Sequence, residues 1–370
     1  MSKKINWKSI IGWGIAALIA VFIVYTNMYE QKVQTQSKKN LYAVVPLTGA
    51  FSSIGKSVEQ AINFWKENNP KAPFDIVMID SETNATKAIT ALQQKTVFDE
   101  SPLILSVTSM ISYNLIPSMN DKDSFTFAIV TTEKDNYDYH KYQRVSNSAN
   151  DTVQPIADYV AQNNFKKIAV VYSNEEFGRL TRNSFVSKLP KDIEILQDMP
   201  IDLKAYDVRI EVQKLIHQPT DAIVILGGPG LGYMNLFKEL KTMNYAGQIV
   251  TGQPFSDPSV YKQLDTSLSG IVAEALCTQT VSGCPSFSKE LSAKLDEKGI
   301  TPWYTVTQTL DALNLIKYTM ENNLPFTQET YQKMGKWTGV AGDVVFSENG
   351  NSSYPFMVVR FKDKNFETIR

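Results

Sequence analysis

Hydroxyl groups, an aromatic ring and one amide recur at the points where apolar runs of this sequence end. The run VVPLTGAFSSIG (44–55) passes from apolar residues into an uncharged loop, and later runs end in a similar way. Hydroxyls, backbone N–H groups and a ring can hold a small polar molecule by hydrogen bonding and stacking. Each Ser or Thr alone is equally well explained as the N-terminal cap of a helix. The candidate residues in the later runs are Thr108, Ser109, Thr131, Thr132, Phe177, Pro229 and Gln253.

The composition argues against several other chemistries. His140 and His217 are the only histidines. The sequence therefore offers few histidines as metal ligands or as the base of a Ser-His or Cys-His pair. Neither a G-x-S-x-G elbow nor a P-loop is present, and GGPGLG (227–232) does not keep the spacing of a dinucleotide-binding loop. Lys and Arg number 37 against 38 Asp and Glu, without the basic excess typical of nucleic-acid-binding proteins. We therefore expect no enzyme, no metal, no cofactor and no nucleic-acid partner.

The elements that must position the candidates alternate between strands and helices. The chain has 370 residues, 43% of them hydrophobic, which is enough for two domains. A polar stretch at 137–150 separates two series of strands, each with helical patterns such as 56–68 and 151–163 between them. This order predicts an α/β fold of two doubly wound parallel-sheet halves. The strands are expected at 41–46, 74–80, 102–106, 125–130, 166–173, 221–228 and 247–252.

The strand ends decide where the candidates lie. In open parallel sheets, ligands bind outside the carboxyl ends of the strands, and the candidates follow those ends. The opening loop also leads into a helix N-terminus with free N–H donors. A long helix is expected at 304–322. The tail GDVVFSENGNSSYPFMVVRF is expected to form a hairpin around the Asn-Gly turn at 349–350.

The N-terminus predicts a membrane anchor. Residues 9–29 carry no charge and reach about 31 Å as a helix, enough for a bilayer core. Lysines precede this run, so residues 1–8 are expected in the cytoplasm and the rest of the chain outside it. The alternative is a cleaved signal peptide, but no small-x-small cleavage site follows the apolar run. Residues 30–40 are polar and are expected to form a tether.

Cys277 and Cys284 are the only cysteines. Their spacing in CTQTVSGC suits a small disulfide-closed loop in an exported domain. A metal-binding pair is the alternative, although the sequence offers no second pair of ligands. We therefore predict a disulfide.

Several stretches together resemble a known family. PLTGAFSSIGKSVEQAINFW followed by FDIVMIDSETNATKAITALQQ, then IAVVYSNEEFGRLTRNSF, and finally the tail are similar to the branched-chain amino-acid (Leu/Ile/Val) type of periplasmic binding protein. The resemblance spans roughly 41–370. It implies a type I periplasmic binding protein: two lobes joined by a three-strand hinge that close on a small solute and deliver it to an ABC permease.

The resemblance also implies where the lobes divide. The chain crosses between them three times, near residues 145, 273 and 337 in this sequence. One lobe would contain residues 41–145 and 274–336, and the other residues 146–273 and 337–370.

Site residues follow from the resemblance by position. Ser109, beside Thr108, would grip a ligand carboxylate, and Thr131 and Thr132 would add further contacts. Phe177 would cover the ligand from the second lobe, near Pro229. The acid that often holds the ammonium group of an amino acid falls near Gln253, which carries no charge. Residues Phe51 and Ile54 of the opening loop would shape the side-chain pocket.

Gln253 leaves the nature of the solute open. A buried ammonium without an anion is costly, and the direction of nearby Asp257 is unknown. A neutral or anionic solute is therefore as good a candidate as an amino acid.

The favoured function is a membrane-tethered, extracytoplasmic solute-binding component of an ABC importer. The alternative is a ligand-sensing receptor subunit that regulates a membrane partner with the same lobes. An enzyme on this scaffold is disfavoured because the strand-end loops offer no general base matched to a nucleophile. The sequence specifies neither the solute nor the oligomeric state.

Overall fold

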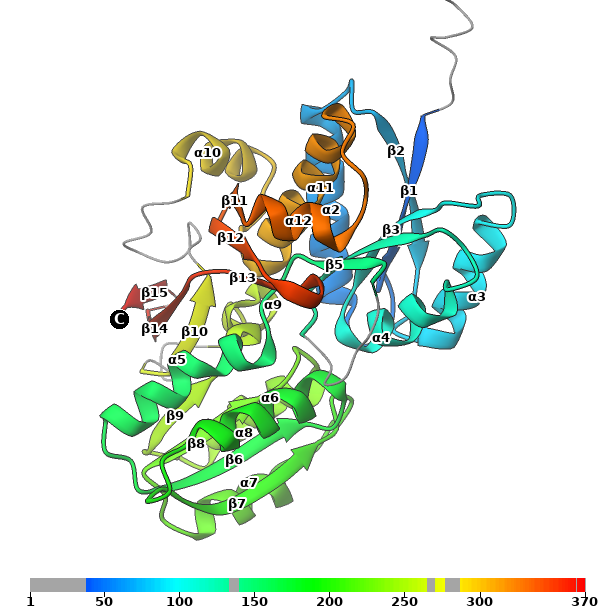
Figure 1. Cartoon of the computed structure of the whole chain (residues 1–370). Coiled ribbons are helices and arrows are strands. Elements are labelled where there is room, and N and C mark those ends of the chain that lie inside the picture. Colours follow the sequence, from blue (N-terminus) through cyan, green and yellow to red (C-terminus); the bar gives the residue numbers. More distant parts are fainter. Residues whose placement is uncertain (1–37, 133–139, 265–269, 277–286, 364, 370) are drawn as a thin grey trace, which may run out of the picture. The chain divides into compact units, whose positions relative to one another are not determined.

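Two large sheets organise the part of the chain that the structure describes (Figure 1). The computed structural model describes residues 38–132, 140–264, 270–276, 287–363 and 365–369. The predicted membrane span at 9–29, most of the tether, Cys277 and Cys284 lie outside these residues. None of the helices within the described ranges is both long and apolar enough to cross a bilayer.

The first sheet has the strand order β2-β1-β3-β4-β5. The pairs β1–β3, β3–β4 and β4–β5 are parallel. Every residue of β3 and β4 is buried, as expected for parallel strands covered on both faces. The strands are β1 (Lys39–Val45), β2 (Phe74–Asp80), β3 (Leu103–Val107), β4 (Phe125–Ile129) and β5 (Tyr142–Arg144).

Helices α2 and α11 lie against each other beside the first sheet, with Trp65 of α2 donating a hydrogen bond to Asn314 of α11 at 2.8 Å. Helices α3 and α4 also contact each other. The helices associated with this part of the molecule are α2 (Ser52–Asn68), α3 (Ala85–Lys95), α4 (Ser109–Ser118), α10 (Lys289–Glu297), α11 (Tyr304–Glu321) and α12 (Gln328–Met334).

The second sheet has the order β15-β14-β10-β9-β8-β6-β7. Strands β6 to β10 pair in parallel, and β14 and β15 extend the sheet in antiparallel fashion. The strands are β6 (Lys167–Ser173), β7 (Glu194–Ile201), β8 (Ala222–Leu226), β9 (Gln248–Thr251), β10 (Val272–Leu276), β14 (Phe356–Lys362) and β15 (Asn365–Thr368).

Alternate residues of β8 enter two different cores. Val224 and Leu226 pack in a cluster with residues of α5 and α6, whereas Ile223 and Ile225 belong to a cluster with residues of α7 and α8. The sheet is therefore covered by helices on both faces, and the α/β prediction is confirmed. The helices are α5 (Ala149–Gln162), α6 (Glu176–Lys188), α7 (Arg209–His217), α8 (Leu231–Thr242), the short α9 (Pro258–Tyr261) and the 3₁₀ turn η1 (Gln253–Ser256).

The tail forms the predicted hairpin around the Asn-Gly turn, with a short second strand. Asn349 and Gly350 have φ values of 58° and 66° in the turn η3 (Glu348–Gly350), which joins antiparallel β12 (Gly342–Phe346) and β13 (Ser352–Ser353). The second apolar run of the tail forms β14 instead and pairs with β10 and β15. The hairpin is therefore shorter than the two apolar runs, because most of the second run pairs in the large sheet.

A third, three-stranded sheet consists of β11 (Lys336–Gly339), β12 and β13. The carboxylate of Asp311 in α11 accepts hydrogen bonds from the Val340 N–H at 2.7 Å and from the Tyr354 hydroxyl at 3.2 Å. The boundary expected near residue 337 falls at the start of this small sheet, and the boundary expected near 273 falls inside β10.

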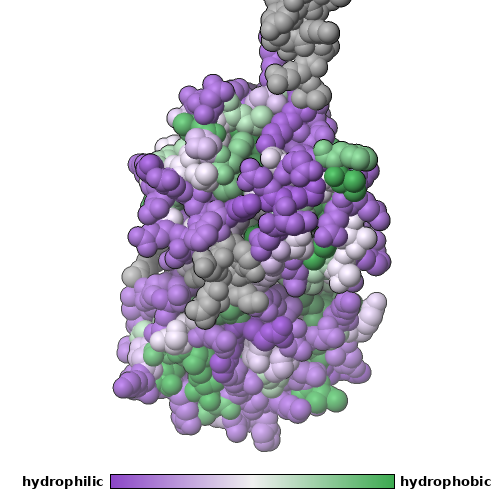
Figure 2. All heavy atoms as spheres, turned by 45° about the vertical axis from the view of Figure 1, so that its right-hand side comes forward, coloured by the Kyte–Doolittle hydropathy of each residue, from purple (hydrophilic) through white to green (hydrophobic). Residues whose placement is uncertain are grey.

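The surface seen in Figure 2 is mainly hydrophilic, with small apolar areas. The apolar residues are instead concentrated in the cores around the two large sheets. Polar loops follow the carboxyl ends of the buried strands in both sheets.

Candidate functional site

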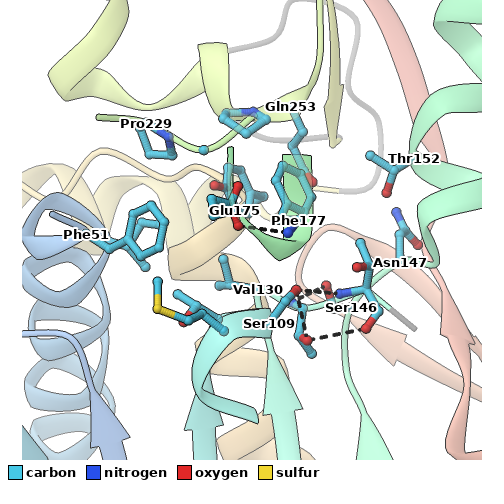
Figure 3. Close-up of a pocket in the computed structure, with 18 residues that line it drawn as sticks. Phe51, Ser109, Val130, Ser146, Asn147, Thr152, Glu175, Phe177, Pro229 and Gln253 are labelled. Carbon is cyan, nitrogen blue, oxygen red and sulfur yellow. Dashed lines mark hydrogen bonds between the residues drawn. The ribbon is translucent and has the colours of Figure 1, made fainter. Parts of the chain in front are cut away.

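A cavity lies where the carboxyl ends of the two large sheets face each other (Figure 3). It encloses about 520 Å³, part of it open to solvent. The starts of α2 and α4 and the end of β4 form one wall, and the ends of β6, β8 and β9 form the other. The lining residues are Phe51, Ile54, Thr108, Ser109, Met110, Val130, Thr131, Thr132, Ser146, Asn147, Thr152, Glu175, Phe177, Gly228, Pro229, Gln253, Pro254 and Tyr304.

The structure brings all the site residues selected from the sequence to this one cavity. Residues far apart in the chain meet here because each follows the carboxyl end of a strand. Their role in binding a ligand stays a prediction. They are Phe51, Ile54, Thr108, Ser109, Thr131, Thr132, Phe177, Pro229 and Gln253.

Ser109, the first residue of α4, is the centre of a hydrogen-bond cluster. Its side-chain oxygen accepts hydrogen bonds from the Thr132 backbone N–H and from the Thr131 hydroxyl, both at 3.2 Å. A serine hydroxyl accepts two hydrogen bonds and donates one. The Ser109 proton is therefore available to a ligand oxygen, polarised by two donors behind it.

Two lining residues have strained backbones. Thr108 has a φ of 75° and Val130 a φ of 53°, values that L-residues with branched side chains rarely adopt. The Val130 N–H donates a hydrogen bond to the Gln308 side chain at 2.9 Å, which holds the strained turn after β4. Strain of this kind costs of order 1–3 kcal/mol and concentrates at functional sites.

Three buried polar atoms in the wall have no hydrogen-bond partner among the residues that the structure describes: Thr108 Oγ1, Asn147 Nδ2 and Gln253 Nε2. The backbone N–H of Tyr354 donates a hydrogen bond to Asn147 Oδ1, so the amide nitrogen is the unpartnered end of this side chain. An unsatisfied buried polar group costs about 1–3 kcal/mol, and a ligand that pairs with it recovers that free energy. The site is therefore prepared for a ligand with hydrogen-bond acceptors.

Glu175 caps the N-terminus of α6 at the edge of the cavity. Its carboxylate accepts hydrogen bonds from the backbone N–H groups of Phe177 at 2.8 Å and Gly178 at 2.9 Å, and from the Ser173 hydroxyl at 2.7 Å. Burial raises the pKa of Glu175, and these hydrogen bonds oppose the shift. The same contacts fix the backbone of Phe177, whose ring lies over the cavity in Figure 3.

The two walls touch at Phe51 and Gly228. A Cβ atom placed on Gly228 would lie 3.0 Å from the Phe51 ring, closer than side chains normally approach. Ser173 supports Gly228 from behind, because the Gly228 N–H donates a hydrogen bond to the Ser173 hydroxyl at 3.2 Å. Glycine at this position therefore allows the walls to meet.

The family follows from a comparison with known proteins. Residues 43–365 match a family model described as periplasmic binding protein. The chain belongs to the periplasmic binding protein family. The suspected resemblance is confirmed, and the match is to a family of binding proteins, not of enzymes. A comparison with curated proteins found no match.

Solved structures share the fold of this periplasmic binding protein. A leucine binding protein from Thermotoga maritima has a TM-score of 0.78 at 16% identity, over 90% of this chain and 98% of the other. A branched-chain amino acid transporter substrate binding protein from Streptococcus pneumoniae, in complex with isoleucine, has a TM-score of 0.78 at 15% identity, over 90% and 99%.

An ABC-transporter solute binding protein from Rhodopseudomonas palustris, in complex with 3,4-dihydroxy benzoic acid, has a TM-score of 0.76 at 16% identity, over 89% and 94%. At these identities the likeness shows the fold of the binding protein alone.

Sequence reasoning missed half of the cavity wall of this binding protein. Ser146 and Asn147 fall in a stretch that lacks periodicity, and Tyr304 begins a helix that was predicted without a role. Glu175 gives no sequence signal either, because glutamate is not among the residues that usually cap helix N-termini. Asp257, considered as a substitute for an acid at position 253, instead caps α9 through the Ser259 N–H at 2.8 Å and is not among the lining residues.

Proposed function

We propose that this protein captures a small organic solute in the cavity between its two sheets and delivers it to an ABC importer. The observation that carries the proposal is the set of unpartnered polar atoms, on Thr108, Asn147 and Gln253, in a cavity formed by strand ends of both sheets. The family match and the binding-protein titles of the solved structures support it. Leucine, isoleucine and 3,4-dihydroxy benzoic acid in those titles suggest solutes that carry a carboxylate.

The proposed mechanism is capture without chemical change. A ligand carboxylate would accept hydrogen bonds from Ser109 and Thr132 on one wall, while Phe177 and Pro229 cover it from the other. Phe51 and Ile54 would contact the apolar part of the solute. Closure would bury these contacts, since hydrogen bonds gain strength when water is excluded.

The lobes are proposed to hinge at three crossings. We place the first near residue 145, after β5, and the second at the end of β10 near residues 273–276. For the third we favour Ser353–Phe356 over residue 337, because β14 pairs with β10 whereas β11 is held to α11 through Asp311. Hydrogen bonds between Ser146 and Ser352 tie two of the crossings together.

The location is proposed from the sequence. Residues 9–29 would anchor the chain in the cytoplasmic membrane with residues 1–8 inside, and the tether would hold the lobes in the periplasm or outside the cell. Cys277 and Cys284 would form a disulfide there. A retained anchor also suits the second candidate function, a ligand-sensing receptor subunit that acts on a membrane partner.

The test is a binding screen with the full-length chain. Thermal unfolding is measured with amino acids, aromatic acids, short-chain acids, amides and short peptides, and each hit is titrated by calorimetry. Binding to the native state adds RT ln(1 + [L]/Kd) to its stability, so a cognate solute raises Tm. A solute that is released chemically changed, or the absence of any hit, would refute the proposal. Reconstitution with neighbouring permease genes separates an importer component from a sensor.

A further inference from the structure

The middle of β10 contains a buried acid that the binding site described above does not use. Glu274 is 0% exposed, and neither of its carboxylate oxygens has a hydrogen-bond partner within the described part of the chain. The other residues of this strand are apolar, in the run VAEAL. An acid with both oxygens buried and unpartnered requires an explanation, because such groups are costly.

A small cavity of about 200 Å³ lies beside Glu274. Val272 pairs with Val250, and Val224 with Val250, so the next row across the sheet is Leu226, Gly252 and Glu274. Gly252 has no side chain in this row, which leaves space next to the carboxylate. The lining residues are Thr152, Val153, Ile156, Phe177, Thr181, Leu226, Gly227, Gly252, Pro254 and Glu274.

The small cavity adjoins the main one. Thr152, Phe177 and Pro254 line both, so these three side chains form the partition between them. Thr152 and Phe177 approach the main cavity from opposite sides in Figure 3. A group that extends from a solute in the main cavity past the Phe177 ring would reach Glu274.

The charges around Glu274 disfavour its ionised form in the empty protein. Burial raises its pKa well above the usual range, and repulsion from Asp151 at the start of α5 adds to the shift. Tyr304 is the other titratable group close enough to interact with its charge. Among the described residues that line either cavity there is no Lys, Arg or His, so the chain itself supplies no cation there.

We propose that the small cavity is a subsite for a positively charged group of the solute, an ammonium or a guanidinium, which pairs with Glu274. This inference rests on the proposed function and narrows the solute to one with a cationic group besides the part held at Ser109. In amino-acid binders the acid that holds the ammonium group often lies at the position of Gln253. In this protein Glu274, on a different strand, would take that role. Burial raises the pKa of Glu274 and so favours its protonated form in the empty protein. Ionisation of Glu274 on pairing with the cation would then release a proton, and affinity would rise with pH.

Matched probes test the charge without knowledge of the natural solute. Each cationic probe is paired with an analogue of similar shape that lacks the charged nitrogen: L-leucine with isocaproate, γ-aminobutyrate with valerate, and p-aminomethylbenzoate with p-ethylbenzoate. The full-length chain is titrated by calorimetry in phosphate and in Tris, because proton release makes the measured enthalpy depend on the buffer. We expect the charged member of at least one pair to bind about tenfold tighter or more.

Variants test the residue. Glu274→Gln keeps the shape of the side chain, and should weaken the charged probe about tenfold or more while leaving its analogue unchanged and abolishing proton release. Gly252→Ala keeps the carboxylate and fills the space, since its added Cβ would meet only Pro254 at 3.6 Å. Gly252→Ala should weaken binding of the same charged probe, and it tests the subsite even if Glu274→Gln folds poorly. Asp311→Asn, which alters a buried acid outside both cavities, is the control and should bind normally.

Each outcome decides a different question. If uncharged or anionic solutes bind while no cationic probe does, the subsite is refuted and the proposed function stands. If no solute in any panel binds, both fail. Equal binding of a cationic probe by the parent, Glu274→Gln and Gly252→Ala also refutes the subsite. Stabilisation by sodium or potassium ions alone, lost in Glu274→Gln, would refute an organic cation as the occupant.

Discussion

The side-chain oxygen of Ser109 accepts a hydrogen bond from the backbone N–H of Thr132, 3.2 Å away. This bond joins the start of α4 to the loop after β4, two segments that follow neighbouring parallel strands. It leaves the Ser109 hydroxyl proton directed to other acceptors and holds the Thr132 segment in place.

Ser109→Ala should weaken solute binding by about 1–3 kcal/mol, because the ligand loses a polarised donor in a buried site. Thr132→Ala should have an effect of similar size. Calorimetric titration with a hit from the solute screen measures both. Ser112→Ala is a matched control, since that hydroxyl is in the same helix but bonds to Ser106 outside the cavity wall. An unchanged Kd in Ser109→Ala would refute its assignment as a ligand donor.

Thr108→Gly should leave the empty protein more stable than Thr108→Ala, by about 1 kcal/mol or more, because only glycine accepts a φ of 75° without strain. In an ordinary backbone conformation a glycine variant is less stable than the alanine variant. A more stable glycine variant would therefore indicate backbone strain at position 108. Both variants lose the unpartnered hydroxyl and should bind the solute equally weakly. Urea unfolding gives the stabilities, and a more stable alanine variant would show that the backbone is not strained here.

Glu175→Ala should cost about 1–2 kcal/mol of stability, because α6 loses its cap. It should also weaken binding, since the Phe177 N–H loses the carboxylate that positions it. Asn84→Ala removes the cap of α3, outside the cavity, and should lower stability to a similar extent without changing Kd. If both variants bind like the parent, the cap serves the fold and not the site.

Asp311 should make the protein less stable as pH rises. Burial raises its pKa from 3.8 to about 7, against hydrogen bonds from Val340 and Tyr354. Between these values the unfolded chain has lost the proton that the folded protein retains, so stability falls across this window and is level above it. Below the window both states are protonated and the effect vanishes.

Urea unfolding of the parent and Asp311→Asn at about pH 4 and about pH 8 measures this linkage. The free-energy difference between the two proteins should shift in favour of the variant by a few kcal/mol, in order of magnitude, at the higher pH. A difference that does not change with pH would mean that folding does not raise the pKa of Asp311.

The proposed N-terminal anchor predicts a simple fractionation result. The full-length chain should sediment with membranes and remain there in high salt, because a run of about 21 uncharged, mainly apolar residues is long enough to span a bilayer. A chain that begins at Lys38 should be soluble and keep the solute affinity of the full-length protein. N-terminal sequencing of the membrane-bound form separates an anchor from a signal peptide, since cleavage would remove residues 9–29.

Sequence reasoning selected residues that line a single cavity because strand ends are easy to find. Apolar runs such as LILSV mark buried strands, and parallel topology then brings Ser109, Thr132 and Phe177 to one edge without knowledge of their contacts. The positions of these residues follow from the strand topology alone. Residues that are weak candidates individually therefore meet at a single cavity.

Contacts that depend on tertiary context could not be predicted in this way. Glu274 lies in a run that indicates only a buried strand, and its lack of a partner is visible only once α5 and β9 surround it. The strand β5, Tyr142–Arg144, has three residues and no apolar period. The short length of the tail hairpin also depends on tertiary context, because most of its second run pairs with β10.

The contact between Phe51 and Gly228 has a consequence for how affinity could be tuned. A larger residue at position 228 would keep the walls apart and lower the fraction of molecules able to close. Apparent affinity scales with that fraction, so every solute would lose the same factor. Tightness of capture and discrimination among solutes are therefore set by different residues and can vary independently.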